Sequence, residues 1–359
     1  MADEVAASGG KMQPRLLKTG IVLILTLAWG FGCARAAPVT LGANYPGSSG
    51  LSGGFATPGP AVHPTDPASA QARFADSPRP AGYHQRPGIA VPAPFPLILP
   101  LNEQVIRIPM TLNRASGSQG LSLEATLYLP DGAGPFPLVV LSHGTPRDPG
   151  RRVSQGRIRY ASQSWEFVNL GFAVVIPMRR GYGSSEGEYA EAEGRCDQAL
   201  FYEAGLESAR DLLATVRFMA ARPFIDPRRI ILAGHSSGGF ASLALASQGF
   251  PGLAAVINFG GGRGSKQGEN CSPFNLIEAC QKYGRTSRVP TLWIYCENDT
   301  YFPPWLGRLM CQAYWEAGGE ARMVLLPPFN GEGHFLFNDG RGAPLWTPIV
   351  SRFLSGLGF

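Results

Sequence analysis

One stretch of the sequence decides the fold: Arg229-Ile230-Ile231-Leu232-Ala233-Gly234-His235-Ser236-Ser237-Gly238-Gly239-Phe240-Ala241-Ser242-Leu243-Ala244-Leu245. It begins with an apolar, β-branched run typical of a buried strand and ends in residues with helical spacing. The pattern Gly-x-Ser-x-Gly stands between them, centred on Ser236. A strand that turns sharply into a helix exposes the residue at the turn, and glycines two positions before and after it avoid a collision. The stretch therefore predicts Ser236 as a nucleophile, with Gly234 and Gly238 giving it room to turn.

The same five-residue pattern occurs twice more, around Ser52 and Ser185. Ser52 lies in a segment rich in proline and glycine, and Ser185 lies in a polar loop with no helix pattern directly behind it. The chemistry depends on the strand-turn-helix setting, so only Ser236 is expected to act. The helix behind Ser236 also directs its amino-terminal dipole at the site, which favours developing negative charge.

Outward from this stretch, short apolar runs alternate with amphipathic segments. The runs expected as strands cover residues 137–141, 172–176, 229–233, 254–259, 291–295 and 322–326. The segments expected as helices cover residues 161–170, 199–221, 239–247, 305–317 and 347–357. This alternation predicts an α/β fold, with a mostly parallel sheet and helices on both faces. Alternating runs at 103–108 and 121–129, with a turn at 113–120, predict an antiparallel hairpin that opens the sheet.

The amino-terminal residues 1–36 have the pattern of a bacterial secretory signal. A cationic start with Lys11, Arg15 and Lys18 precedes an uncharged apolar stretch, and Ala34-Arg35-Ala36 fits a cleavage site. An uncleaved membrane anchor is the alternative, although the apolar stretch has about 15 residues where a membrane span needs about 20. A lipoprotein attached through Cys33 is a weaker one, because Gly30-Phe31-Gly32 matches such sites poorly. We therefore expect export, to the periplasm or the medium, without stable membrane insertion once the signal is removed.

Residues 37–98 form a second distinct region, a leader rich in proline and glycine. Between residues 37 and 100 there are 13 Pro, 8 Gly and only five charged side chains, which predicts a disordered leader without a packed core. One catalytic domain is then expected at 99–359. The net charge of +5 includes four basic and two acidic residues of the signal, and the balance after cleavage gives no reason to expect nucleic-acid binding.

A nucleophilic serine needs a base, and the base needs a carboxylate that fixes its tautomer. Of the five histidines, His334 lies in a loop after the last strand run. The others lie in the leader, at the end of an early strand, or beside the nucleophile: His63, His84, His143 and His235. We therefore predict His334 as the base. Asp299 follows the strand run 291–295 at the edge of the sheet where ligands bind, and we predict it as the acid, with Glu297 as its competitor.

The oxyanion formed on a substrate carbonyl needs fixed hydrogen-bond donors, and losing one costs about 3–4 kcal/mol of barrier. The backbone amide of Ser237 is the first predicted donor. The turn Ser142-His143-Gly144-Thr145-Pro146 follows an early strand, and the amide of Thr145 is the second predicted donor. A plain turn at a strand end is the alternative.

Across residues 99–359 the chain resembles the α/β-hydrolase superfamily. The landmarks that carry the resemblance stand in order: Leu141-Ser142-His143-Gly144, Arg180-Gly181-Tyr182-Gly183-Ser184-Ser185-Glu186-Gly187, Gly234-His235-Ser236-Ser237-Gly238-Gly239 and Cys296-Glu297-Asn298-Asp299. The chain looks most like dienelactone hydrolase-type esterases and the catalytic domains of prolyl oligopeptidase-like serine peptidases. Two departures matter. Dienelactone hydrolases use a cysteine where this chain has Ser236, and no segment here is long enough for the propeller of the oligopeptidases.

The resemblance implies a two-step acyl transfer without a metal or organic cofactor. Ser236 attacks the carbonyl, His334 accepts its proton, and water then releases the acid from the acyl-enzyme. The expected function is cleavage of carboxylic esters, and the expected partner is a small ester or a short peptide. Two alternatives stay open: a serine peptidase of the prolyl oligopeptidase or dipeptidyl peptidase type, and a catalytically inactive binding protein of the same fold. The sequence leaves the oligomeric state open.

Five cysteines remain after signal cleavage: Cys196, Cys271, Cys280, Cys296 and Cys311. In an oxidising compartment, two disulfides and one free thiol are expected, with Cys271 and Cys280 as the favoured pair. Five buried, reduced thiols are the alternative.

Two further segments bear on the substrate. The insert at 260–288 is expected to form a lid or pocket wall together with Tyr301, Phe302 and Trp305. Five arginines follow the predicted oxyanion turn: Arg147, Arg151, Arg152, Arg157 and Arg159. They either select acidic substrates or form a solvated surface loop.

Overall fold

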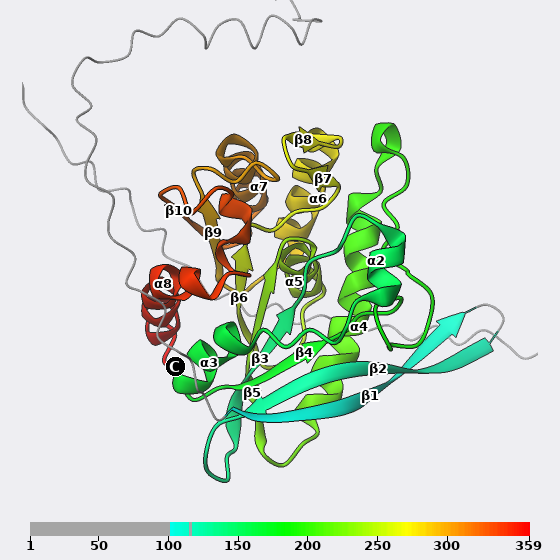
Figure 1. The fold of residues 1–359 in the computed structure, drawn as a ribbon, viewed down its shortest axis with the longest axis vertical. Coiled ribbons are helices and arrows are strands. Elements are labelled where there is room, and N and C mark those ends of the chain that lie inside the picture. Colours follow the sequence, from blue (N-terminus) through cyan, green and yellow to red (C-terminus); the bar gives the residue numbers. More distant parts are fainter. Residues whose placement is uncertain (1–100, 115–116) are drawn as a thin grey trace, which may run out of the picture. The chain divides into compact units, whose positions relative to one another are not determined.

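The computed structural model describes residues 101–114 and 117–359. Its centre is an eight-stranded sheet in the order β1-β2-β4-β3-β5-β6-β9-β10 (Figure 1). The strands are β1 Asn102–Arg114, β2 Gly117–Leu129, β3 Phe136–Ser142, β4 Ala173–Pro177, β5 Ile225–His235, β6 Leu253–Phe259, β9 Thr291–Cys296 and β10 Ala321–Leu326. The last six of these run parallel, whereas β2 is antiparallel to both β1 and β4. The predicted fold class, a mostly parallel sheet opened by an antiparallel hairpin, is confirmed.

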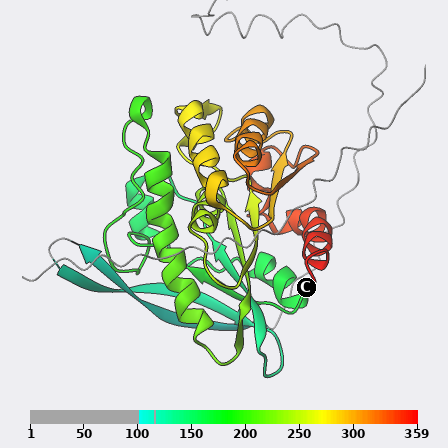
Figure 2. The same cartoon turned by 180° about the vertical axis from the view of Figure 1, so that it is seen from behind.

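Helices cover both faces of this sheet, as Figures 1 and 2 show from opposite sides. The α-helices are α2 Pro149–Ser154, α3 Ala161–Asn169, α4 Phe201–Ala220, α5 Ser237–Gln248, α6 Pro273–Thr286, α7 Pro304–Glu316 and α8 Ala343–Ser355. Buried residues of α4, α5, α6 and α7 share one apolar cluster, and those of α3 and α8 share the other. The sheet therefore separates two cores.

The central strand β5 shows why the buried strands are continuous apolar runs. Ile230 and Leu232 pack into the first core, and Ile231 and Ala233 pack into the second. Successive side chains of a strand point to opposite faces, so a strand covered on both sides needs an apolar residue at every position. Because β3, β5, β6, β9 and β10 are parallel, the loops after them meet at one edge of the sheet.

The turn predicted at 113–120 is wrong, because the hairpin continues through most of it. β1 and β2 pair from Asn102 with Leu129 to Arg114 with Gly117. Residues 117–120 are exposed, and their side chains show no alternation of apolar and polar residues. Backbone hydrogen bonds between strands form without such alternation, so the strand extends through these residues. The far end of the hairpin reaches past the helices in Figure 1.

The insert at 260–288 contains structure that the sequence analysis did not assign. A two-stranded hairpin pairs β7 Ser265–Lys266 with β8 Glu269–Asn270, and α6 follows it. Pro273 begins α6, where a missing N–H costs nothing because the first helical amides have no intrahelical acceptor. The short α2 was also missed, and it starts in the same way with Pro149 after the capping carboxylate of Asp148.

The predicted signal at 1–36 and leader at 37–98 lie outside the described residues. Among residues 101–114 and 117–359, none of the helices combines the length and apolar character that a membrane crossing requires.

Candidate active site

Ser236 lies at the sharp turn between β5 and α5. Its backbone has φ 56° and ψ −125°, a conformation that costs a side-chain-bearing residue about 1–3 kcal/mol. A Cβ atom on Gly234 would lie 2.4 Å from the carbonyl carbon of Gly238, and one on Gly238 would lie 2.2 Å from the carbonyl oxygen of Ser142. Neither position has room for a side chain, so the two glycines are what allows this turn to form.

His334 and Asp299 are brought together by the loops after β10 and β9. His334 Nδ1 lies 3.1 Å from Asp299 Oδ2, and both side chains are buried. The other carboxylate oxygen of Asp299 accepts hydrogen bonds from the backbone amides of Tyr301, at 2.9 Å, and Phe302, at 2.8 Å. A proton on Nδ1, donated to Asp299, leaves the Nε2 atom of His334 as the acceptor that a general base needs. The competing acid Glu297 is exposed.

Glu332 was missed in the sequence analysis, although it lies two residues from His334. One of its carboxylate oxygens accepts from the backbone amides of His334 and Thr300, each at 3.0 Å. Glu332 thus ties the loop that bears the histidine to the loop that bears Asp299. An acidic residue just before a candidate base is the sequence signal that would have found it.

Ser236 and His334 line one open cavity of about 1050 Å³ at the carboxyl edge of the sheet. Ser185, centre of a rival Gly-x-Ser-x-Gly pattern, is mostly buried and its hydroxyl is used structurally: it donates to the carbonyl of Met178 at 2.6 Å and accepts from the amide of Glu124 at 2.9 Å. Ser52 lies outside the described residues. Of the two rival serines, the one that the structure describes is therefore not placed for catalysis.

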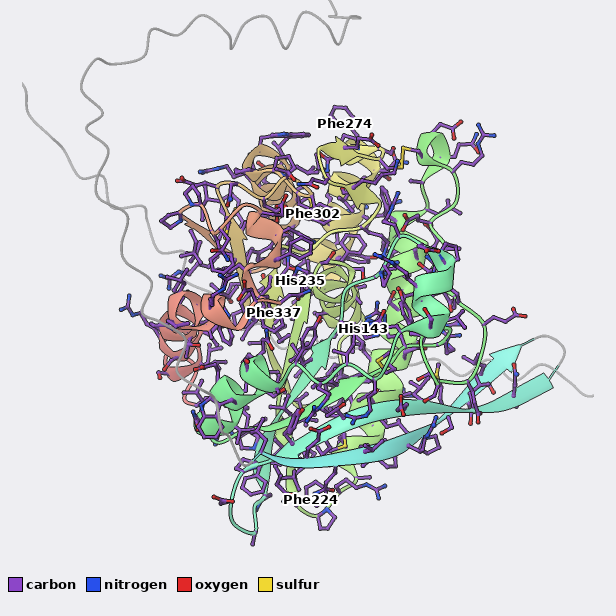
Figure 3. The ribbon with its side chains drawn as sticks, in the orientation of Figure 1. His143, Phe224, His235, Phe274, Phe302 and Phe337 are labelled. Atoms are coloured by element: carbon purple, nitrogen blue, oxygen red, sulfur yellow. A yellow bond between two sulfur atoms is a disulfide. The ribbon has the colours of Figure 1, made fainter. Side chains whose placement is uncertain are left out.

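His235 contacts the loop of the candidate base, a role that the sequence analysis did not foresee. Its Nε2 lies 2.8 Å from the carbonyl oxygen of His334, and its ring lies 4.6 Å from that of His334. Its ring also stacks on Phe337, labelled beside it in Figure 3, at 6.2 Å. Burial, together with the neighbouring His334, lowers the pKa of His235 to about 3. The ring is therefore neutral, and its Nε2–H donates to the backbone of His334.

The two residues predicted to donate from the oxyanion hole, Thr145 and Ser237, are linked through their side chains. Their hydroxyl oxygens lie 2.5 Å apart, and the hydroxyl of Thr145 lies 2.7 Å from that of Tyr182. Ser237 is the first residue of α5, so its amide has no intrahelical acceptor. Both residues line the cavity beside Ser236. The bond between the two hydroxyls links the turn after β3 to the turn between β5 and α5. Both turns lie on the side of Ser236 away from Asp299.

A buried ionic cluster, absent from the sequence analysis, lies behind this turn. The guanidinium of Arg179 is fully buried and donates to Glu191, to the Ser142 hydroxyl at 2.9 Å and to the His143 carbonyl at 2.7 Å. It also reaches the hydroxyls of Thr145, at 3.3 Å, and Ser237, at 3.4 Å.

Arg263 is the second cation of the cluster and pairs with the same carboxylate, at 3.1 Å from Glu191 Oε2. Burial alone would raise the pKa of Glu191, but Arg179 and Arg263 lower it to about 2. One carboxylate therefore serves two buried guanidinium groups. Two consecutive arginines after a buried strand, Arg179 and Arg180, were the available signal.

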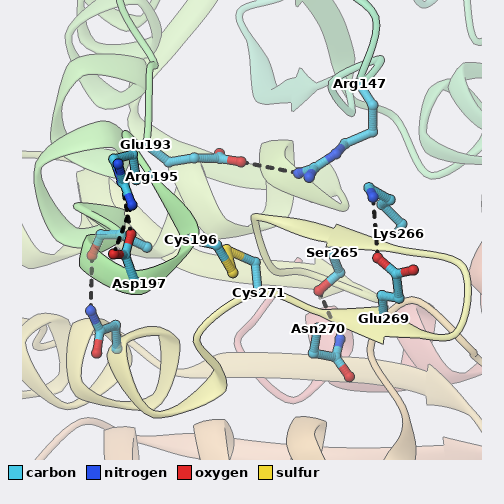
Figure 4. The surroundings of a disulfide bond; sticks show 12 residues. Arg147, Glu193, Arg195, Cys196, Asp197, Ser265, Lys266, Glu269, Asn270 and Cys271 are labelled. Carbon is cyan, nitrogen blue, oxygen red and sulfur yellow. Dashed lines mark hydrogen bonds and ion pairs between the residues drawn. A yellow bond between two sulfur atoms is a disulfide. The ribbon is translucent and has the colours of Figure 1, made fainter.

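The predicted disulfide between Cys271 and Cys280 is wrong, because Cys271 pairs with Cys196 (Figure 4). The two Cα atoms lie 5.2 Å apart across 75 residues of sequence. Cys280 instead lies on α6 and faces the core, where burial raises the pKa of its thiol. Cys296 and Cys311 are also free and buried. The disulfide joins the insert to the segment before α4.

The cavity wall matches the expected lid in part. Residues 262–265 of the insert line it, together with Tyr301 and Phe302, whereas Trp305 is half exposed and does not. The five arginines after the predicted oxyanion turn divide into two groups. Arg147, Arg151 and Arg152 line the cavity, and Arg157 and Arg159 instead pair with Glu103 on β1. Among the described residues, no group of three or more His, Cys, Asp and Glu side chains is placed to hold a metal ion.

The sequence matches the family model of the X-Pro dipeptidyl-peptidases (S15 family) over residues 119–267. It is 31% identical over 141 residues to the quorum-quenching protein AidA of Acinetobacter baumannii, an alignment that covers 39% of this chain and 40% of that protein. The chain spans less than half the length of the curated relatives that it matches.

Two solved structures share the fold. The acylaminoacyl peptidase of Pyrococcus horikoshii superposes with a TM-score of 0.53 at 16% identity, over 71% of this chain and 41% of that one. The Pyrococcus furiosus esterase Pf2001 superposes with a TM-score of 0.50 at 13% identity, over 72% of this chain and 92% of that one. With its sheet order and its strained serine turn, the chain has the α/β-hydrolase fold, and its candidate site combines a serine at a sharp turn with a histidine bonded to a carboxylate.

Proposed function

We propose that this protein is an exported serine hydrolase that cleaves carboxylic esters through an acyl-enzyme intermediate on Ser236. One observation carries the proposal: a serine in a strained turn and a histidine bonded to a buried carboxylate line the same cavity. Strain of this kind persists where the surrounding structure enforces it, and active sites are where it gathers. A plain turn between a strand and a helix has no need of it.

The residues divide the reaction into two steps. Ser236 Oγ attacks the ester carbonyl while Nε2 of His334 takes its proton, and Asp299 stabilises the imidazolium. The carbonyl oxygen becomes an oxyanion that accepts hydrogen bonds from the amides of Ser237 and Thr145. Collapse breaks the bond to the alcohol, which leaves with the proton from His334. A water molecule, deprotonated by His334, then attacks the acyl-enzyme, and the bond to Ser236 Oγ breaks as His334 returns the proton to it, which releases the acid and free Ser236.

The charge of the cavity favours an esterase over a peptidase of the dipeptidyl peptidase type. A dipeptidyl peptidase must hold the protonated α-amino group of its substrate. Four guanidinium groups and two carboxylates line this cavity, and like charges across a binding surface repel. A panel of nitrophenyl esters of rising acyl length, beside aminoacyl-nitroanilides, separates the two activities. Hydrolysis of the esters is expected, and hydrolysis of the anilides alone would overturn the choice.

A fluorophosphonate probe tests the nucleophile and the alternative of an inactive binding protein together. The wild type should be labelled and Ser236→Ala should not. Ser185→Ala is the matched control, because Ser185 sits in the same sequence pattern outside the site, and it should keep its labelling once a thermal melt shows that it is folded. A wild type that resists the probe would favour the inactive protein, and labelling of Ser236→Ala would remove Ser236 from its role.

Export rests on the signal pattern at 1–36 and is supported by the disulfide between Cys196 and Cys271, a bond that persists in oxidising compartments. Mass spectrometry of the protein from fractionated bacteria should find an amino terminus at about Ala37 in the periplasm or the medium. An intact chain beginning at Met1 in the membrane fraction would support the anchor instead.

A further inference from the structure

We propose that Tyr301 is a positioning residue of this reaction: the face of its ring holds the imidazole of His334 and stabilises the positive charge that the imidazole acquires when it takes the proton of Ser236. The inference rests on the proposed function and adds a residue that acts through the base. It comes from one aromatic ring that lies almost flat against the candidate base.

The ring of Tyr301 lies nearly parallel to the imidazole of His334. The centres of the two rings lie 4.5 Å apart, and their planes make an angle of 20°. The rings of His235, Phe302 and Phe335 lie 4.6, 5.5 and 5.7 Å from the imidazole, at angles of 48°, 52° and 68°. The face of an aromatic ring carries partial negative charge and attracts a cation within about 6 Å of the ring centre. Of these four rings, that of Tyr301 presents its face most fully to the base.

The backbone of Tyr301 is held from two sides. Its amide donates at 2.9 Å to Asp299, the carboxylate that also bonds His334. Its carbonyl accepts from Nδ2 of Asn270, on strand β8 of the insert. The side chain is half-buried and forms part of the cavity wall. Tyr301 is therefore fixed by both the acid and the insert, and the phenol hydroxyl takes no part in these contacts.

A ring in this position acts more strongly on the transition state than on the free enzyme. A histidine that serves as general base is neutral before it takes a proton and positively charged afterwards. The attraction between the cation and the ring therefore grows as the proton moves, and an interaction that is stronger in the transition state raises kcat. Because His334 is buried, water screens this attraction little. We expect the ring to contribute about tenfold to kcat, or about 1.4 kcal/mol of barrier.

Four titratable groups other than Tyr301 lie around the imidazole of His334. Asp299 bonds its Nδ1 atom, and Glu332 accepts from its backbone amide. Burial lowers the pKa of His235 to about 3 and raises the pKa of the Cys296 thiol to about 12, so both of these groups are neutral near pH 7. A replacement of Tyr301 leaves all four groups in place. A change in the pH dependence of the rate then reports on the ring.

Two replacements separate the face of the ring from the hydroxyl. Tyr301→Phe keeps the ring and should keep kcat on a nitrophenyl ester within about twofold of the wild type. Tyr301→Leu keeps an apolar cover without the ring, and it should lower kcat about tenfold with KM little changed. The acidic limb of kcat/KM should move to lower pH in Tyr301→Leu, by up to about one unit, because a base without the ring holds its added proton less tightly. The limb should stay in place in Tyr301→Phe.

Tyr202→Leu is the matched control for the loss of a stacked tyrosine. Tyr202 lies on α4 and is half-buried, as Tyr301 is, and its ring stacks on that of Tyr283 at 5.1 Å and 28°. Neither of these two residues lines the cavity beside Ser236. The control should keep the kcat and the acidic limb of the wild type. Thermal melts of both leucine variants show whether they are folded.

Fluorinated phenylalanines at position 301 test the charge of the ring face even where Tyr301→Leu does not fold. Each fluorine withdraws electrons from the face of the ring and hardly changes the size of the ring. If the face stabilises the imidazolium, kcat should fall stepwise as one, two and three fluorines are added.

The outcomes separate this inference from the proposed function. An unchanged kcat in Tyr301→Leu, an equal loss in Tyr202→Leu, or a constant kcat across the fluorinated series would overturn the role of the ring and leave the esterase intact. Equal losses in Tyr301→Phe and Tyr301→Leu would also overturn it, because they would assign the effect to the hydroxyl. If the wild type hydrolyses no ester and the fluorophosphonate probe does not label it, the proposed function itself fails.

Discussion

On one side of Ser236 lie Asp299 and His334, on the loops after β9 and β10, whereas the other side holds the turn after β3 with the buried Arg179 behind it. The first side is ordered by two carboxylates, Asp299 and Glu332, by backbone amides and by aromatic rings, among them Tyr301, which stacks on His334 at 4.5 Å. The second side is ordered by a permanent charge cluster. A base must change its protonation during the reaction, whereas a site that receives an anion benefits from charges that never change.

The largest effect is expected from removing the hydroxyl of Ser236, which lies between the two sides. Ser236→Ala should lower kcat on a nitrophenyl ester by roughly 10⁶-fold, because neither side can act without the nucleophile. The melting temperature should not fall, because alanine loses only the hydroxyl. Initial rates and a thermal melt check both expectations. A residual rate within tenfold of the wild type would place the nucleophile elsewhere.

The next effect compares one glutamate from each side. Glu191→Gln leaves two buried guanidinium groups without their anion and should reduce the free energy of unfolding by about 3–5 kcal/mol. Glu332→Gln keeps an acceptor for the amides of Thr300 and His334 and should cost about 1 kcal/mol. Urea unfolding of both variants measures the difference. Equal losses would contradict the distinction between a side held by paired buried charges and a side whose carboxylates mainly accept from backbone amides.

One buried histidine from each side should make the free energy of unfolding depend on pH. Burial lowers the pKa of His143 and of His235 to about 3. An unfolded histidine titrates near pH 6.5, so between pH 6.5 and 3 the unfolded chain binds protons that the native protein excludes.

The free energy of unfolding should therefore fall as the pH drops through this window, by up to about 1.4 kcal/mol per pH unit for each histidine. Urea unfolding at pH 7, 6 and 5 tests it. His235→Gln should lower the slope, and an unchanged slope would mean that His235 is protonated in the native protein.

The smallest expected effect concerns the link between the two proposed oxyanion donors, Thr145 and Ser237. Thr145→Val removes the hydroxyl that meets Ser237, Tyr182 and Arg179 but keeps the backbone amide. We expect kcat to fall about tenfold, or about 1.4 kcal/mol of barrier, with KM little changed. Thr215→Val is the control, because its buried hydroxyl bonds the carbonyl of Asp211 away from the cavity. A change in KM alone would assign Thr145 to substrate binding.

The strands and the order of the motifs were predictable because their signals are local. The apolar composition of a run such as residues 229–233 predicts that the strand is buried. A serine with glycines two positions before and after it predicts a sharp turn at the serine. That His334 and Asp299 lie together was predictable because parallel strands end at one edge, which brings together loops distant in sequence. The position of the hairpin turn was predicted wrongly because the end of the hairpin is exposed and has no apolar alternation that marks it as strand.

The charge cluster and the disulfide could not be predicted in the same way. Arg179, Glu191 and Arg263 are spread over 85 residues, and nothing local states that one carboxylate meets two arginines. Cys271 lies nine residues from Cys280 and 75 from Cys196, yet it bonds the distant one. Proximity in sequence predicted Cys280 as the partner of Cys271, but Cys280 lies on the buried face of α6.

The sequence by itself determined the α/β class, the turn at Ser236 and the candidate roles of Asp299 and His334, because strand burial and glycine geometry act within a few residues. Only the tertiary structure decided which arginines face the cavity, which cysteines pair and which carboxylate pairs with two buried arginines. Those properties depend on distances across the fold, and electrostatic interactions depend on burial as well as on separation.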